Sequence, residues 1–129
     1  MKPFVVSALF IVHFSVSAAG LTCSSHPPKD TPLSALAGLA TISKAEAQKT
    51  ALARVKAPFT KIVSAELEIE QGCLVYSFDI RLSSKSGVEE IMVDAGTGKI
   101  VSQKHETVMQ EAAEQAKDRA TLKKQSPLN

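Results

Sequence analysis

In the part of the chain that follows residue 19, the side chains best suited to catalysis or metal binding are two cysteines and two histidines: Cys23, His26, Cys73 and His105. Thiolate sulfur and imidazole nitrogen are the usual ligands of structural zinc, so four such side chains suffice for a tetrahedral site. Their spacing matches no common zinc module, however, and an even number of cysteines in an oxidising compartment favours a disulfide. We predict a Cys23–Cys73 disulfide and no metal, with His26 and His105 as the candidate ligands of a metal-binding alternative.

Residues 94–105 contain two weak similarities to ligand-binding motifs. The Gly-Thr-Gly-Lys run at residues 96–99 is similar to a phosphate-binding loop, but Ile100 follows where that motif needs Ser or Thr. A calcium-binding loop that starts at Asp94 would need Glu at its last position, which His105 occupies. Each segment lacks a residue that its motif requires for binding phosphate or calcium, so the sequence predicts no cofactor.

Three alternating glutamates, Glu66, Glu68 and Glu70, are the remaining feature that could carry chemistry. Paired carboxylates can act as general acid and base. Glutamates that alternate with apolar residues are also expected on the solvent-exposed face of a strand, so the three glutamates need no catalytic role to explain them. The sequence has no credible Ser–His–Asp or Cys–His arrangement, so we predict no catalytic residue and no enzyme.

The N-terminus has the three parts of a secretory signal peptide. Lys2 gives the first part its charge, residues 4–16 are almost all apolar, and residues 17–19 are small. The apolar run is about 13 residues long, whereas a membrane-spanning helix needs about 20. We predict cleavage after residue 19, a periplasmic or secreted protein, and no stable membrane span after cleavage. An uncleaved anchor and a lipoprotein modified at Cys23 are the alternatives, although the residues before Cys23 match a lipobox poorly.

Composition is that of an ordinary globular protein. The 129 residues are 44% hydrophobic and 22% charged, and 15 basic residues face 13 acidic ones. Such a balance argues against a disordered acidic chain and against nucleic acid as a partner. About 110 residues remain after cleavage, which allows one small core that benefits from reinforcement. A disulfide that closes a loop of about 50 residues would supply about 4 kcal/mol.

The pattern of residues predicts an α+β fold. Residues 20–41 are rich in Pro and Ser, which indicates a flexible arm. Ser43 and Glu46 form a capping box that starts a helix, and Pro58 ends this helix near Lys56. Strands are expected at residues 63–70, 74–82, 88–93 and 99–102, separated by short polar turns. One N-terminal helix would pack on a three- to four-stranded antiparallel meander sheet.

The C-terminal segment, residues 107–129, is charged and rich in alanine, which favours a helix. Its apolar stripe is narrow and offers little surface to bury. We therefore expect a solvated tail helix, and docking on a partner is the alternative.

Residues 42–106 resemble the PepSY domain family. The resemblance rests on the Ile42-Ser43 helix start, the strand that contains Tyr76, and the closing run Val-Asp-Ala-Gly-Thr-Gly-Lys-Ile at residues 93–100. In this turn Asp94 can bind amides two residues on, and Gly98 permits a positive φ. Gly96 departs from the bulkier or Pro residue that is frequent at its place. Exported relatives often carry an early cysteine and another beside the Gly of the first hairpin, which implies the same disulfide here.

The resemblance implies a non-enzymatic module that inhibits or regulates a peptidase or binds another envelope protein. The partner would be a protein, for instance a secreted or periplasmic peptidase. The binding surface would be the sheet edge or the closing turn, with five candidate residues: Tyr76, Asp94, Thr97, Gly98 and Lys99. A small-ligand or metal-binding envelope module is the alternative function.

Overall fold

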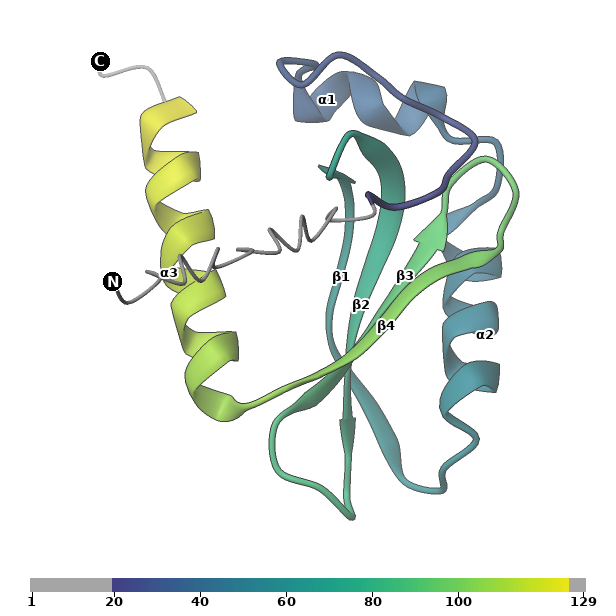
Figure 1. Cartoon of the computed structure of the whole chain (residues 1–129), viewed down its shortest axis with the longest axis vertical. Coiled ribbons are helices and arrows are strands. Elements are labelled where there is room, and N and C mark those ends of the chain that lie inside the picture. Colours follow the sequence, from purple (N-terminus) through teal and green to yellow (C-terminus); the bar gives the residue numbers. More distant parts are fainter. Residues whose placement is uncertain (1–19, 126–129) are drawn as a thin grey trace, which may run out of the picture.

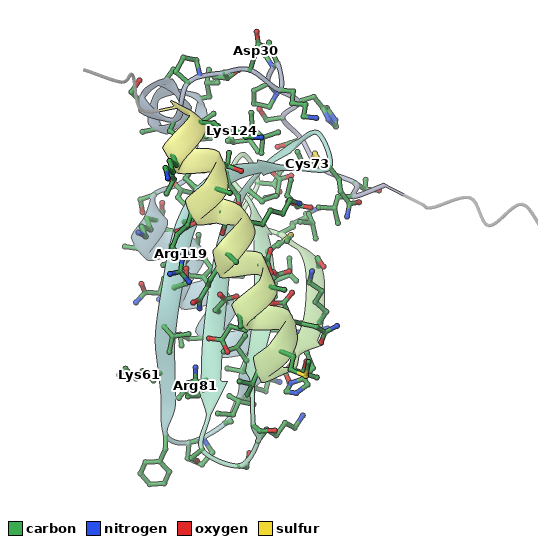
Figure 2. The ribbon with its side chains drawn as sticks, turned by 90° about the vertical axis from the view of Figure 1, so that its left-hand side faces the viewer. Asp30, Lys61, Cys73, Arg81, Arg119 and Lys124 are labelled. Carbon is green, nitrogen blue, oxygen red and sulfur yellow. A yellow bond between two sulfur atoms is a disulfide. The ribbon has the colours of Figure 1, made fainter. Side chains whose placement is uncertain are left out.

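A four-stranded antiparallel sheet forms the centre of the computed structural model, which describes residues 20–125 (Figure 1). The strands follow one another in space in chain order: β1 (Thr60–Glu70), β2 (Cys73–Leu82), β3 (Val88–Asp94) and β4 (Ile100–Glu106). The helices are α1 (Leu33–Leu36), the 3-10 turn η1 (Ala37–Leu39), α2 (Lys44–Val55) and α3 (Val108–Gln125). Helix α2 covers one face of the sheet and α3 lies over the other (Figure 1, Figure 2). The predicted α+β meander is confirmed.

Helix α2 begins and ends where its local sequence requires. The Ser43 hydroxyl accepts from the Glu46 amide at 3.2 Å, and the Ser43 amide donates to the Glu46 carboxylate at 2.8 Å. This reciprocal capping box satisfies two backbone donors that have no partner inside the helix. Lys56 takes a left-handed conformation (φ 46°) and ends the helix two residues before Pro58.

The core lies between α2 and the sheet. Ala47 and Ala51 are fully buried, and their small side chains let the helix backbone approach the strands closely. The large side chains of this core come from α1 and from the two inner strands, β2 and β3: Leu36, Leu74, Tyr76, Phe78, Ile80, Leu82, Ile91 and Val93. A smaller apolar cluster on the opposite face joins Cys73, Val75 and Met92.

Two predicted strand boundaries, the start of β1 and the end of β4, were wrong by more than one residue. Strand β1 begins at Thr60, and a bulge between Ile62 and Ser64 leaves Val63 38% exposed, although strict alternation with Ala65, Leu67 and Ile69 predicts that Val63 faces the core. A bulge inserts one residue and so shifts the alternation on one side of it. Strand β4 continues to Glu106 because β3 pairs with it as far as Val88.

Helix α3 lies over the polar face of the sheet, and most of its side chains are exposed. An ion pair of 3.2 Å joins Glu111 of α3 to Arg81 of β2. Within residues 20–125, no helix combines the length and apolarity needed to cross a membrane. The predicted signal peptide lies outside the described residues.

Candidate functional site: the junction of arm and turn

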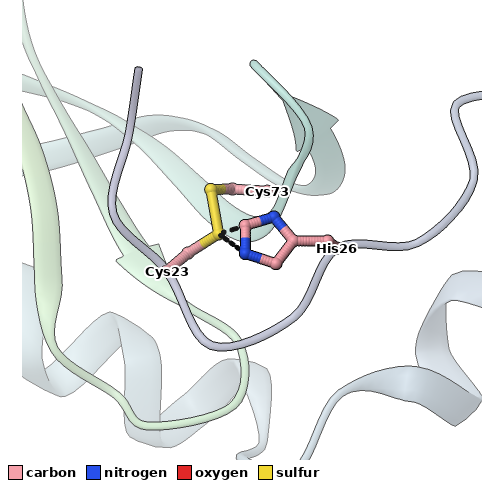
Figure 3. A group of neighbouring side chains, drawn as sticks. All are labelled: Cys23, His26 and Cys73. Carbon is pink, nitrogen blue, oxygen red and sulfur yellow. Dashed lines mark hydrogen bonds between the residues drawn. A yellow bond between two sulfur atoms is a disulfide. The ribbon is translucent and has the colours of Figure 1, made fainter. Parts of the chain in front are cut away.

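A disulfide attaches the N-terminal arm to the start of β2 (Figure 3). Cys23 and Cys73 are bonded, with a Cα–Cα distance of 5.9 Å, and Cys73 is completely buried. The predicted pairing is therefore present. Because both sulfurs belong to the bridge, neither is a thiolate that could bind zinc.

The two candidate metal-ligating histidines are not brought together. His26 lies on the disulfide, with Nδ1 3.6 Å from Cys23 Sγ and 3.1 Å from the carbonyl oxygen of Gly72, just before β2 (Figure 3). His105 lies toward the other end of the sheet, where Nδ1 is 2.9 Å from Glu89. Each imidazole thus has its own partner, and the four residues of the zinc alternative do not converge.

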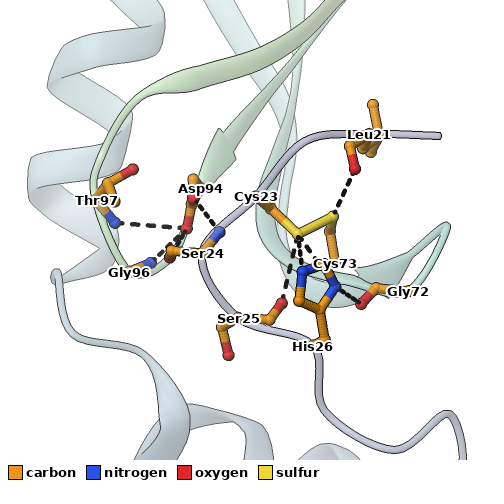
Figure 4. The surroundings of a disulfide bond; sticks show 10 residues. All are labelled: Leu21, Cys23, Ser24, Ser25, His26, Gly72, Cys73, Asp94, Gly96 and Thr97. Carbon is orange, nitrogen blue, oxygen red and sulfur yellow. Dashed lines mark hydrogen bonds between the residues drawn. A yellow bond between two sulfur atoms is a disulfide. The ribbon is translucent and has the colours of Figure 1, made fainter. Parts of the chain in front are cut away.

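Asp94 holds the arm against the closing turn (Figure 4). Its carboxylate accepts from the amide and the hydroxyl of Ser24, both at 2.7 Å, and from the amides of Gly96 at 2.8 Å and Thr97 at 3.4 Å. Burial alone would raise the pKa of Asp94, but the hydrogen bonds from Ser24, Gly96 and Thr97 outweigh burial and lower this pKa. Asp94 is therefore a structural anion, because both of its carboxylate oxygens accept hydrogen bonds from the arm or the turn.

The backbone of the turn explains its two glycines. Gly98 has φ +75° and donates to the carbonyl of Asp94 at 2.8 Å, a conformation that an L side chain rarely adopts. At Gly96 a Cβ atom would collide with the hydroxyl of Ser24. A larger residue at position 96 would displace the Ser24 hydroxyl from its hydrogen bond with Asp94, which gives a physical reason for Gly96 in this chain.

The candidate binding residues divide into two groups. Tyr76 lies in the core, 6% exposed, and its hydroxyl donates to the Ile42 carbonyl at 2.9 Å, which ties β2 to the start of α2. Thr97 and Lys99 are exposed and border a hollow of about 310 Å³ beside the arm. The turn thus presents two polar side chains to a partner, and their role in binding stays a prediction.

Sequence reasoning missed a group of carboxylates under α3. Asp79, Glu90 and Glu106 come from three neighbouring strands, and their oxygens lie within 4.8 Å of one another. Lys104 Nζ is 3.2 Å from both Glu90 and Glu106. The ammonium group already provides the cation for this group, so the geometry indicates an ion-pair cluster rather than a set of metal ligands. Lys104 is drawn there by pairing with Glu90 across β3 and β4.

Replacing Asp94 with Asn is expected to lower the free energy of unfolding by about 2 kcal/mol, because charge-assisted hydrogen bonds to Ser24 are lost and an amide donor then faces a donor. Urea unfolding at neutral pH measures the change. Ser24→Ala, which removes only the hydroxyl donor, should cost about 1 kcal/mol. An Asp94→Asn midpoint equal to that of the unaltered protein would show that the junction contributes nothing to stability.

The fold and the junction together define a small helix-on-sheet module whose best-formed polar site is structural. A family model described as the peptidase propeptide and YPEB domain, PepSY, matches residues 41–104. The chain belongs to the PepSY family through this segment, which contains α2, the first three strands and most of β4. Comparison with curated proteins and with solved structures found no significant match to the chain.

Proposed function

We propose that this chain is an exported, non-enzymatic PepSY protein that binds and restrains a peptidase or another envelope protein. The observation that carries the proposal is the match of residues 41–104 to a peptidase propeptide domain, a class of module that is generally not catalytic. The disulfide supports export, because such bonds persist in oxidising compartments. The short apolar N-terminus supports it as well.

Two surfaces are available for a partner. Strands β1 and β4 are the edges of the sheet, and an edge strand can pair with an extended segment of another chain. The closing turn adds the exposed Thr97 and Lys99. A metal-binding module has less support, because both thiols are in the disulfide and His26 and His105 lie apart.

Isothermal calorimetry with a purified secreted metallopeptidase tests association directly. We expect saturable binding, and Lys99→Ala should weaken it about threefold, as for one exposed charge at an interface rim. Lys49→Ala, which removes an exposed lysine from α2, is the matched control and should leave binding unchanged. No heat of binding at high concentrations of both proteins would exclude the inhibitory form of the proposal.

A further inference from the structure

Strand β1 has a hydrogen-bonding neighbour on one side only, and its other edge borders two adjoining hollows. One hollow, of about 380 Å³, lies between β1, α1 and α3, and the other, of about 590 Å³, lies between β1, α1 and the arm. They share Leu33 and Glu68, and we call them together the β1 groove. An extended chain that pairs with β1 near residues 66–69 would lie in this groove.

The two sides of the β1 groove differ in chemistry. Glu66 and Glu68 of β1 and Asp118 of α3 line the side under α3. Leu67 belongs to the other, apolar side, where it packs with the core that contains Leu36. Lys29 and Asp30 at the arm carry opposite charges and offset each other. The groove therefore has one acidic wall and one apolar wall.

The acidic wall has no cation of its own within the described part of the chain. The three carboxylates of this wall, Glu66, Glu68 and Asp118, form none of the ion pairs found among residues 20–125, and neither does the adjoining Glu70. Burial, together with the charges of Glu66 and Glu70, raises the pKa of Glu68 to about 7. A cationic group placed beside this wall would relieve the repulsion among the three carboxylates.

We propose that the β1 groove binds an extended peptide in which cationic and apolar residues alternate, added to the sheet as a fifth strand. Successive side chains of a strand point to opposite faces of a sheet, so every second side chain would meet the acidic wall and the others the apolar wall. The unpaired backbone groups of β1 would supply the main-chain hydrogen bonds. This inference rests on the proposed function and names the chemistry of the segment that the partner contributes.

Charge excludes a second copy of the chain as the occupant. Antiparallel pairing of β1 with β1 of another molecule would place the glutamates of both strands on one face, opposite one another. Like charges directly opposite one another destabilise a strand pair. The same glutamates thus protect the edge from self-association and select a basic segment.

Fluorescence anisotropy with short synthetic peptides and the protein purified after export tests the proposal. At pH 8, where Glu68 is ionised, a labelled peptide of alternating Lys and Val should bind, and one of alternating Glu and Val should not. Glu66→Gln should weaken binding about threefold, and the double variant with Glu68→Gln about tenfold. Glu89→Gln, which removes the same charge from β3, away from both hollows, is the matched control and should leave binding unchanged.

Backbone pairing is tested with the same Lys–Val peptide methylated at every second amide nitrogen. Methylation on the edge that faces β1 should abolish binding, because those amides can no longer donate. Three results would each overturn the inference. The methylated peptide or the Glu–Val peptide could bind as tightly as the unmethylated Lys–Val peptide, or the double variant could bind the Lys–Val peptide as tightly as the unaltered protein does. If the protein binds a peptidase but not the Lys–Val peptide, the peptide-binding role of the β1 groove is refuted and the proposed function is not. If it binds the Lys–Val peptide but no peptidase, the proposed function is refuted and the peptide-binding role of the groove is not.

Discussion

Reduction of the Cys23–Cys73 disulfide is expected to lower the free energy of unfolding by about 4 kcal/mol, because the bridge spans 50 residues and restricts the unfolded chain. A small domain is stabilised by only about 5–15 kcal/mol in total, so this loss is a large part of it. The arm should be released first, since without the bridge only non-covalent contacts join it to the sheet, among them the hydrogen bonds from Ser24 to Asp94 and from the Leu74 amide to the Ser25 carbonyl. Urea unfolding with and without a reductant measures the effect.

The double variant Cys23→Ala, Cys73→Ala is the control for the reductant. It should unfold at nearly the same urea concentration as the reduced protein and should not respond to reductant. A reduced protein as stable as the oxidised one would show that the arm is not part of the cooperative unit.

Raising the pH from 5 to 8 is expected to lower the free energy of unfolding by about 2 kcal/mol and to loosen α3 from the sheet. The cause is an excess of carboxylates where α3 faces the strands. Burial, with neighbouring acidic groups, raises the pKa of Glu68 to about 7 and that of Asp79 to about 6. The pKa of Glu114 rises to about 7 through burial and its hydrogen bond with Glu106.

The charged groups between α3 and the sheet come from all four strands and from α3: Glu66, Glu68, Asp79, Arg81, Glu90, Lys104, Glu106, Glu111, Glu114 and Asp118. Among these ten side chains, only Arg81 and Lys104 are cationic. The raised pKa values favour the protonated form in the folded state. The stability they contribute is complete below the ordinary values of 3.8 and 4.5 and is lost as the pH rises through 6 to 7. The lowered pKa of Asp94 acts below 3.8, outside this window.

Glu114→Gln separates this effect from a general response to pH. The amide keeps a donor toward Glu106 and cannot ionise, so the variant should be more stable than the unaltered protein at pH 8 and equal to it at pH 5. Urea unfolding at both pH values, with hydrogen exchange of the α3 amides, provides the measurement. Equal exchange of α3 at pH 5 and pH 8 would contradict the expected loosening.

Features encoded in neighbouring residues could be predicted from the sequence. The start of α2 follows from Ser43 and Glu46, its end from Pro58, and the sheet order from short turns between alternating strands. The closing turn is of the same kind, because Asp94 binds the amide of Gly96 two residues on. Such contacts need no knowledge of the rest of the fold.

Features that depend on distant partners could not be predicted. The bulge at Val63 and the extension of β4 to Glu106 are set by pairing with other strands. The hydrogen bonds from Ser24 to Asp94 join residues 70 positions apart, and no local pattern marks Ser24. Alternation showed that the second face of β1 is polar, but only the position of α3 shows that Asp118 lies near the carboxylates of Glu66 and Glu68.

Restraint of a peptidase is tested most directly by titrating the purified protein into a secreted metallopeptidase and following hydrolysis of a peptide substrate. We predict that the rate falls with increasing protein and reaches a plateau once the peptidase is saturated. Protein whose disulfide has been reduced and alkylated should be the weaker inhibitor, because its arm is no longer covalently attached to β2. An unchanged rate at high molar excess of the oxidised protein would contradict the proposed restraint.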